Sequence, residues 1–198
     1  MYDNNVLAPE EQPICKLYDN DALAPEEQTI YNNQINLVPE GRPINMSDTY
    51  TQLYIQLVFA VKGRKNFIHH SWEDELYKYI TAVIQNDKHK LLAINGMPDH
   101  IHIFIGLNPR ISISDLVKDI KRASNNWINN NGFIKERFEW QNGFGAFSYG
   151  KSQIKMICRY IENQKQHHAK KSFKNEYVTL LTEFTIEFKP EYLFTFYD

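Results

Sequence analysis

A histidine pair separated by one hydrophobic residue is the feature of this sequence best suited to chemistry. His100 and His102 flank Ile101 at the start of the stretch HIHIFIGL. Side chains two apart on a strand project in parallel from one face, and imidazole is a common ligand for divalent metals. The pair could therefore hold one cation, although two ligands are too few for a complete site. Two half-exposed sheet histidines that make hydrogen bonds would show the same spacing.

A second polar group follows at helical spacing in the stretch SQIKMICRYIENQKQHHAKK. Its members recur at three- and four-residue steps and share a face separate from the apolar stripe: Tyr160, Gln164, His167 and His168. A tyrosine with a carboxamide one turn later could supply a nucleophile and a further metal ligand together. Taken alone, the pattern is equally typical of an amphipathic helix with a polar outer surface.

Sequence patterns typical of strands and of a hairpin turn lie on both sides of the histidine pair. The residue patterns predict strands over residues 50–61, 90–97 and 100–107 and within 143–149. Pro98 and Asp99 favour a turn, so the second and third strands should form an antiparallel hairpin.

Helices are predicted where apolar side chains recur every three or four residues. Ser71 with Asp74 and Ser112 with Asp115 resemble capping boxes, and the helix after Ser112 should end in the Asn-rich run 129–132. Two further helices are expected, from Ser152 to about Lys171 and over about 175–183.

The order strand, helix, strand, strand, helix, strand predicts an α+β fold. It is the order of a ferredoxin-like antiparallel sheet that carries its helices on one face. The other face should then stay available for function, with the tyrosine on a C-terminal catalytic helix.

Composition sets limits on the class of protein. The 198 residues, 42% hydrophobic and 14% aromatic, suit one compact domain and exclude disorder throughout. The N-terminus lacks a basic start followed by an apolar run, and no stretch approaches bilayer length, so we expect a cytoplasmic protein without a membrane partner. Cys15 and Cys158 are too few for a disulfide framework or a thiolate zinc site.

The N-terminal part contains an internal repeat. Residues 2–14 recur almost unchanged at 18–30 and more loosely at 31–44. The repeats offer too little apolar surface to fold on, which predicts a disordered acidic leader over residues 1–45. Three copies could form a binding tail, although translated repetitive DNA upstream of a start at Met46 explains the near-identity more simply.

Charge divides unevenly between this leader and the remainder. The leader holds two basic residues against eight acidic ones, whereas residues 46–198 hold 20 against 16. The predicted domain is therefore mildly basic, which is compatible with a phosphate backbone as partner.

The histidine pair and the tyrosine helix together resemble the tyrosine HUH transposases of insertion sequences that move as single-stranded DNA, and their relatives associated with palindromic repeats. The resemblance covers roughly Asp48 to Tyr197 and rests on YTQLYIQLVFAVKGR, PDHIHIFIGL, WQNGFGAFSYGKSQI and RYIENQKQHHAKKSF. The letters HUH stand for His, hydrophobe, His, which here are residues 100–102. In this order of elements, the tripeptide followed by YIENQ is highly specific.

The resemblance implies a residue-level site. His100 and His102 would bind Mg²⁺ or Mn²⁺, Gln164 would complete the metal site, and Tyr160 would be the nucleophile. The protein would be a metal-dependent endonuclease and strand transferase that cuts and rejoins single-stranded DNA through a 5′-phosphotyrosine. In the mobile-element branch it would be a homodimer, with the Tyr160 helix completing the partner's site.

Basic residues on two predicted helices are candidates for contact with a single-stranded, hairpin-containing DNA substrate. They are Lys118, Lys121, Arg122, Lys155 and Arg159. Solvated helix faces would look the same. Two other functions also stay open, a domesticated relative that processes genomic palindromic repeats and a non-catalytic ferredoxin-like nucleic-acid-binding module.

Overall fold

The computed structural model describes residues 50–169, 171–189 and 193–194. The predicted leader, residues 1–45, lies outside the described residues, and its separation from residues 46–198 stays a prediction. The elements below all belong to the unit Gln52–Asp198.

The described strands form one four-stranded antiparallel sheet with the order β2-β3-β1-β4. The strands are β1 (Tyr54–Ala60), β2 (Lys90–Met97), β3 (His100–Gly106) and β4 (Gly145–Tyr149). Met97 pairs with His100, so β2 and β3 make the predicted hairpin. This strand order, with β1 and β3 at the centre, confirms the predicted ferredoxin-like α+β fold.

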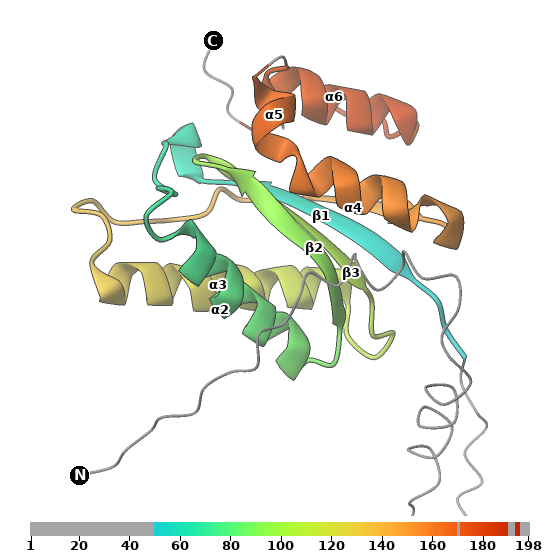
Figure 1. Cartoon of the computed structure of the whole chain (residues 1–198), viewed down its shortest axis with the longest axis horizontal. Helices are drawn as coiled ribbons and strands as arrows, with labels where there is room; N and C mark the ends of the chain where they lie inside the picture. Colours follow the sequence, from blue (N-terminus) through green and yellow to red (C-terminus); the bar gives the residue numbers. More distant parts are fainter. Residues whose placement is uncertain (1–49, 170, 190–192, 195–198) are drawn as a thin grey trace, which may run out of the picture. The chain divides into compact units, whose positions relative to one another are not determined.

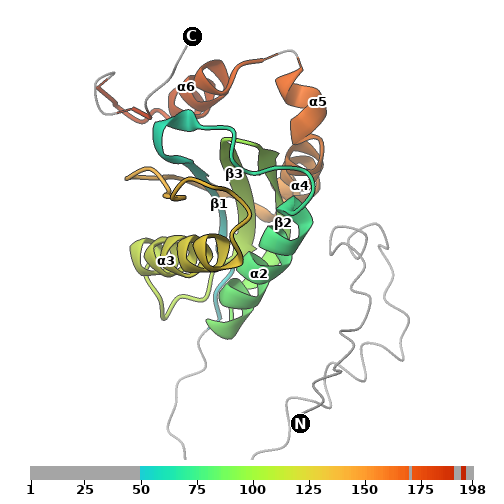
Figure 2. The ribbon, with the colours of Figure 1, turned by 90° about the vertical axis from the view of Figure 1, so that its left-hand side faces the viewer.

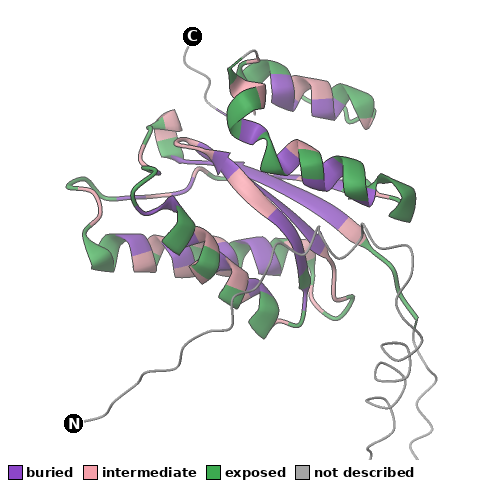
Figure 3. Ribbon diagram, in the orientation of Figure 1, coloured by how far each residue is buried: buried purple, intermediate pink, exposed green. Residues whose placement is uncertain are grey.

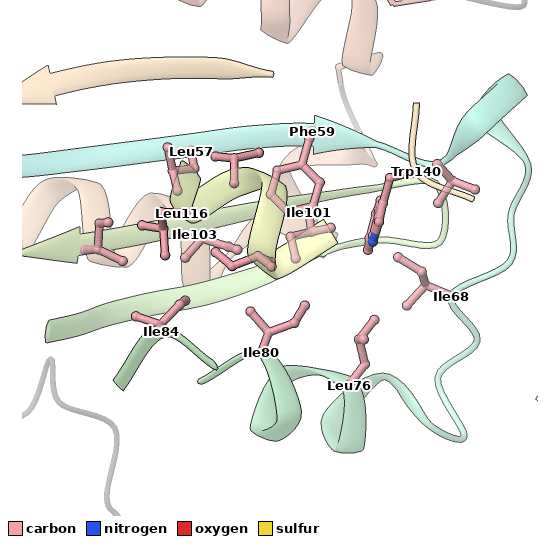
Figure 4. Packing of buried hydrophobic residues seen from close by; sticks show 14 of the residues in the cluster. Leu57, Phe59, Ile68, Leu76, Ile80, Ile84, Ile101, Ile103, Leu116 and Trp140 are labelled. Atoms are coloured by element: carbon pink, nitrogen blue, oxygen red, sulfur yellow. The ribbon is translucent and has the colours of Figure 1, made fainter. Parts of the chain in front are cut away.

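One face of the sheet packs on α2 (Glu73–Asn86) and α3 (Ile113–Asn131), as Figure 1 shows. Ile101, Ile103 and Ile105 of β3 are fully buried on this side. The close-up in Figure 4 shows Ile101 and Ile103 beside residues of β1 and α2, namely Leu57, Phe59, Leu76, Ile80 and Ile84. Burial of this apolar cluster is the main source of stability for the sheet.

The predicted helix boundaries were right for α3 and wrong for α2. The Ser112 side chain accepts a hydrogen bond from the Asp115 amide, and Gly132 ends the helix with a left-handed φ of 66°. The predicted cap at Ser71 does not form, because α2 begins at Glu73 with Trp72 at its N-cap. Trp72 is buried and stacks on Phe133, so packing sets the entry of the chain.

The C-terminal helices cover the other face of the sheet (Figures 1 and 2). They are α4 (Ile154–Glu162), α5 (Gln164–His168) and α6 (Phe173–Glu183), and short 3₁₀ turns lie at Lys62–Arg64 and Lys151–Gln153. The helix predicted from Ser152 to about Lys171 is therefore divided, with its break at Asn163.

This face is not left available, contrary to the prediction. An apolar cluster joins it to α6, comprising Val58, Ala60, Phe147, Phe173, Tyr177, Leu180, Leu181 and Phe194. In Figure 3 the central strands are buried along almost their whole length, as expected for a sheet covered on both sides. Access to the histidine pair is therefore controlled by the C-terminal helices. None of the described helices is long and apolar enough to cross a membrane.

Candidate metal centre and tyrosine

The histidine pair lies on β3, on the side that faces the C-terminal helices. His100 and His102 alternate with core isoleucines and pair with Ala60 and Val58 of β1. Their side chains are 1% and 0% exposed. The two histidines are thus buried groups that need polar partners, and the half-exposed alternative is wrong.

His100 is held by a charged residue from the preceding turn. Its Nδ1 lies 2.7 Å from Asp99 Oδ1, and Arg64 Nε donates to Asp99 Oδ2 at 2.8 Å. The other ring nitrogen, Nε2, lies 3.0 Å from His168 Nε2. Burial lowers the pKa of His100 to about 4 against the opposing effect of Asp99, so the ring is neutral at pH 7.

His102 is fixed by a buried amide on the neighbouring strand. Gln56 Nε2 lies 3.0 Å from His102 Nδ1, and Tyr149 Oη donates to Gln56 Oε1 at 2.8 Å. As with His100, the Nδ1 atom is engaged and Nε2 faces the interior of the site. An amide nitrogen donates, so His102 Nδ1 accepts from Gln56 in this arrangement and the ring proton lies on Nε2. A metal-bound His102 would need the Gln56 amide turned over, with Oε1 accepting from Nδ1–H.

Glu176 brings a carboxylate from α6 into the middle of the imidazoles. It is 1% exposed, and its Oε2 lies 3.0 Å from His168 Nε2, 3.4 Å from His102 Nε2 and 3.8 Å from His100 Nε2. One donor atom from each of the four residues falls within 4.8 Å of the others. The group could hold a divalent cation.

The predicted nucleophile and carboxamide reach the same carboxylate. Tyr160 Oη donates a hydrogen bond to Glu176 Oε1, and Gln164 Nε2 donates to the same oxygen at 3.0 Å. The Tyr160 and His102 ring centroids are 5.9 Å apart. Gln164 Oε1 is buried without a hydrogen-bond partner among the described residues, which leaves one more oxygen available as a ligand.

Electrostatics keep the tyrosine protonated in this arrangement. Burial and the nearby Glu176 carboxylate raise the pKa of Tyr160 well above its usual value. Burial alone would raise the pKa of Glu176, but hydrogen bonds and charge from His102, His168 and Tyr160 hold it well below its usual range. Glu176 is therefore an ionised acceptor for a neutral phenol.

Comparison with known proteins agrees with the order of these motifs. The sequence pattern of the family described as "Transposase IS200 like" matches residues 49–164, more than half of the chain. The chain belongs to this transposase family. The matched range contains the histidine pair, Tyr160 and Gln164, and it ends before His168 and Glu176.

The sequence identity to an individual relative is low. The ISDra2 transposase TnpA of Deinococcus radiodurans is 29% identical over 73 residues, which cover 37% of this chain and 52% of the relative. The match thus spans about half the length of that protein.

Two solved structures are similar at low identity. A candidate transposase from Deinococcus radiodurans R1 has a TM-score of 0.49 at 24% identity, over 64% of this chain and 98% of that one. A REP-associated tyrosine transposase bound to a REP hairpin has a TM-score of 0.47 at 16% identity, over 63% and 73%. The fold assignment therefore rests on the strand order of the chain itself.

Three of the five basic residues predicted to contact DNA lie away from the candidate site. Lys118, Lys121 and Arg122 lie on α3, which packs on the opposite face of the sheet. Lys118 and Arg122 pair with acids one turn earlier, whereas Lys121 Nζ donates to the Gln141 carbonyl at 2.8 Å. A role for them in DNA contact stays a prediction.

The other two basic residues lie on the tyrosine helix. Lys155 and Arg159 are exposed on α4. Arg159 also lines an open groove of about 660 Å³ together with Met156, Tyr160, Asn163, Gln166, His167 and Lys171. This tyrosine groove offers cationic side chains directly beside the candidate nucleophile.

Glu176 is the site residue that the sequence reading missed. It lies on the apolar stripe of α6, between Phe173 and Leu180 at helical spacing. A carboxylate on a buried stripe requires a polar partner. This signal was present in the sequence, whereas the identity of its partners required the fold.

Proposed function

We propose that this protein cleaves and rejoins single-stranded DNA, with Tyr160 as nucleophile and a divalent cation held at His100, His102 and Gln164. The observation that carries the proposal is the convergence of the Tyr160 hydroxyl, the Gln164 amide and the imidazole pair around one buried carboxylate. A module that only bound nucleic acid would have no use for this arrangement.

The residues present fit a divalent cation. The imidazole and carboxylate donor atoms lie within 4.8 Å of one another, and Gln164 Oε1 is a buried oxygen that lacks a partner among the residues described. A bound cation would supply positive charge to offset the negative charge that develops on the phosphate during displacement.

Tyr160 would carry the covalent step. Its Oη forms a bond to the scissile phosphorus while the bond from phosphorus to the 3′ oxygen breaks, giving a 5′-phosphotyrosine and a 3′-hydroxyl. Glu176 Oε1 already accepts the Tyr160 hydrogen bond, so it would orient the hydroxyl for attack, and the phenolic proton would pass to water. The leaving 3′ oxygen gains one proton, which balances the one lost by tyrosine.

The same residues account for rejoining. A phenolate is a weaker base than an alkoxide, so it can serve as a leaving group when a 3′-hydroxyl attacks the phosphotyrosine. The bond energy is retained in the protein–DNA linkage, and no ATP is required.

The substrate we propose is single-stranded DNA that contains a hairpin. Arg159 and Lys171 line the tyrosine groove and could meet backbone phosphates next to Tyr160. One of the similar structures holds a REP hairpin, which supports the choice of substrate class.

Homodimerisation is also part of the proposal. The Tyr160 hydroxyl contacts Glu176 within one chain, so the structure gives an arrangement in which one chain supplies all the groups. In a dimer the short link around Asn163 could instead direct α4 to the partner. Exchange between chains is tested by the mixing experiment in the Discussion.

Covalent capture tests the proposal. The full-length chain, incubated with Mn²⁺ and a single-stranded hairpin oligonucleotide from its own locus, should form a protein–DNA adduct that survives denaturation and maps to Tyr160. Tyr160→Phe should bind the oligonucleotide but form no adduct. Tyr79→Phe is the matched control, because Tyr79 stacks on Trp127 on the far side of the sheet.

Two outcomes would contradict the proposal. Binding without any adduct in the unmodified protein would favour the non-catalytic nucleic-acid-binding module. An adduct on Tyr149 or Tyr177 would show that the assignment of Tyr160 is wrong, even if the class of enzyme is right.

A further inference from the structure

We propose that His168 and Glu176 are metal ligands together with His100 and His102, and that this centre selects a transition cation such as Mn²⁺ or Zn²⁺ over Mg²⁺. The inference builds on the metal-dependent cleavage proposed above. Both added ligands come from the C-terminal segment beyond residue 164, where the family match ends.

The spacing of the donor atoms suits one small cation. Zinc binds nitrogen and carboxylate oxygen at about 2.0–2.2 Å, which places tetrahedral donors roughly 3.3–3.5 Å apart. In this chain His168 Nε2 lies 3.0 Å from both His100 Nε2 and Glu176 Oε2, and Glu176 Oε2 lies 3.4 and 3.8 Å from the other two imidazoles. These four distances are within about half an ångström of the tetrahedral spacing, and all four donor atoms lie within 4.8 Å of one another.

The burial of Glu176 and His168 favours a bound cation between them. Glu176 is 1% exposed and His168 has a side chain that is 6% exposed, so water cannot solvate the carboxylate freely. A buried carboxylate needs compensating positive charge and hydrogen bonds. A divalent cation bound by Glu176 Oε2 would supply that charge directly.

The outer contacts of the ligands are also in place. Asp99 Oδ1 accepts from Nδ1 of His100, which leaves the Nε2 lone pair of that ring for a cation. Gln56 fixes the His102 ring at Nδ1, and its amide would turn over to accept from Nδ1–H when His102 binds metal. Glu176 Oε1 is held by Tyr160 and Gln164, which leaves Oε2 for the cation. Such outer contacts are what orients the ligands of a metal site.

The donor types favour a transition metal. Mg²⁺ prefers oxygen ligands and retains several waters, whereas imidazole suits zinc, copper, iron and nickel. Mn²⁺ also accepts oxygen ligands and stands at the low end of the affinity order of these transition cations. Three imidazoles and one carboxylate therefore disfavour Mg²⁺.

Metal binding itself provides the test. The chelator-treated full-length chain is titrated calorimetrically with Mn²⁺, Zn²⁺ and Mg²⁺, without DNA. We expect Zn²⁺ to bind at least about 10-fold more tightly than Mg²⁺, with Mn²⁺ between the two. Glu176→Gln and His168→Gln should each weaken Mn²⁺ binding by about 10-fold or more, since even outer-shell changes cost 10- to 100-fold.

His167→Gln is the matched control. His167 is adjacent in sequence, but its Nε2 lies 3.7 Å from the other carboxylate oxygen, Oε1, and is outside the four-donor group. It contacts none of the four donor atoms, so its replacement should weaken Mn²⁺ binding less than Glu176→Gln or His168→Gln does. Circular dichroism of each metal-free variant checks that it is folded, and the His168 and Glu176 variants test the site independently.

The possible results separate this inference from the proposed function. Unchanged Mn²⁺ affinity in folded Glu176→Gln and His168→Gln would overturn it, as would preference for Mg²⁺ or a larger loss in His167→Gln. If the Tyr160 adduct still formed in that case, the proposed function would stand. Tight, Glu176-dependent Mn²⁺ binding without an adduct would support the inference and refute the proposed cleavage.

Discussion

Replacement of Asp99 by Asn isolates the contribution of the residue that orients His100. Asp99 accepts from Arg64 Nε at 2.8 Å and lies 2.7 Å from His100 Nδ1, and the Arg64 and Asp99 side chains are only 12% and 15% exposed. Asn has nearly the same shape but lacks the charge. We expect metal affinity to fall 10- to 100-fold, the usual effect of changing such an outer contact, or about 1.4–2.8 kcal/mol.

The same substitution should lower stability, because Arg64 loses its buried partner. An estimate of about 1–3 kcal/mol follows for a buried charged group with a weakened hydrogen bond, which corresponds to a melting temperature lower by roughly 3–10 °C. Calorimetric Mn²⁺ titration and thermal unfolding measure the two effects separately.

Asp119→Asn is the control for this experiment. Asp119 also pairs with an arginine, Arg122 at 2.8 Å, but both side chains are exposed, at 36% and 69%. Exposed pairs contribute about 0–1 kcal/mol, so stability and metal affinity should change little. Unaltered Mn²⁺ affinity in Asp99→Asn, or an equal loss in Asp119→Asn, would refute the orienting role of Asp99.

Three other predictions concern charge, domain boundary and assembly. Burial lowers the pKa of Lys121 from 10.5 to about 8 in the folded chain. Between these two pH values Lys121 is protonated in the unfolded chain but largely neutral in the folded chain. The free energy of unfolding should therefore increase as the pH rises through this range. Denaturant unfolding from about pH 7 to about pH 9.5 should show this gain relative to Lys121→Met, and an equal pH dependence would contradict it. A chain that starts at Met46 should melt and form adduct like the full-length chain, whereas a large loss of either would show that the repeats matter. Mixing His100→Ala/His102→Ala chains with Tyr160→Phe chains should restore some adduct if active sites are shared between subunits, and no rescue would favour sites completed within one chain.

The elements with strong local signals could be predicted from sequence alone. Alternation along β3 assigned its isoleucines to the core and its histidines to the opposite side, as the structure confirms. The end of α3 was equally predictable, because Ser112 and Gly132 act on their immediate neighbours. These features depend on residues a few positions apart.

The division between α4 and α5 could not be predicted in the same way. The polar spacing from Tyr160 to His168 continues through Asn163 as if the helix were unbroken. At Asn163 the backbone leaves helical geometry, with ψ at 19°, and its side chain donates to the Arg159 carbonyl at 2.8 Å. The break allows Gln164 and His168 to face one buried site, an arrangement that depends on packing against the sheet.

The C-terminal helix α6 connects the fold of this protein to its candidate site. Phe173 and Tyr177 pack on apolar residues of β1 and β4, and Glu176 lies between them. The same contacts that bury the apolar stripe therefore hold the carboxylate against the imidazoles. Gly145 of β4 shows how close this packing is, since a β-carbon there would lie 2.9 Å from the Tyr177 ring. A larger residue at position 145 would force the rings of Phe147 and Tyr177 to shift, and Tyr177 is the neighbour of Glu176 on α6.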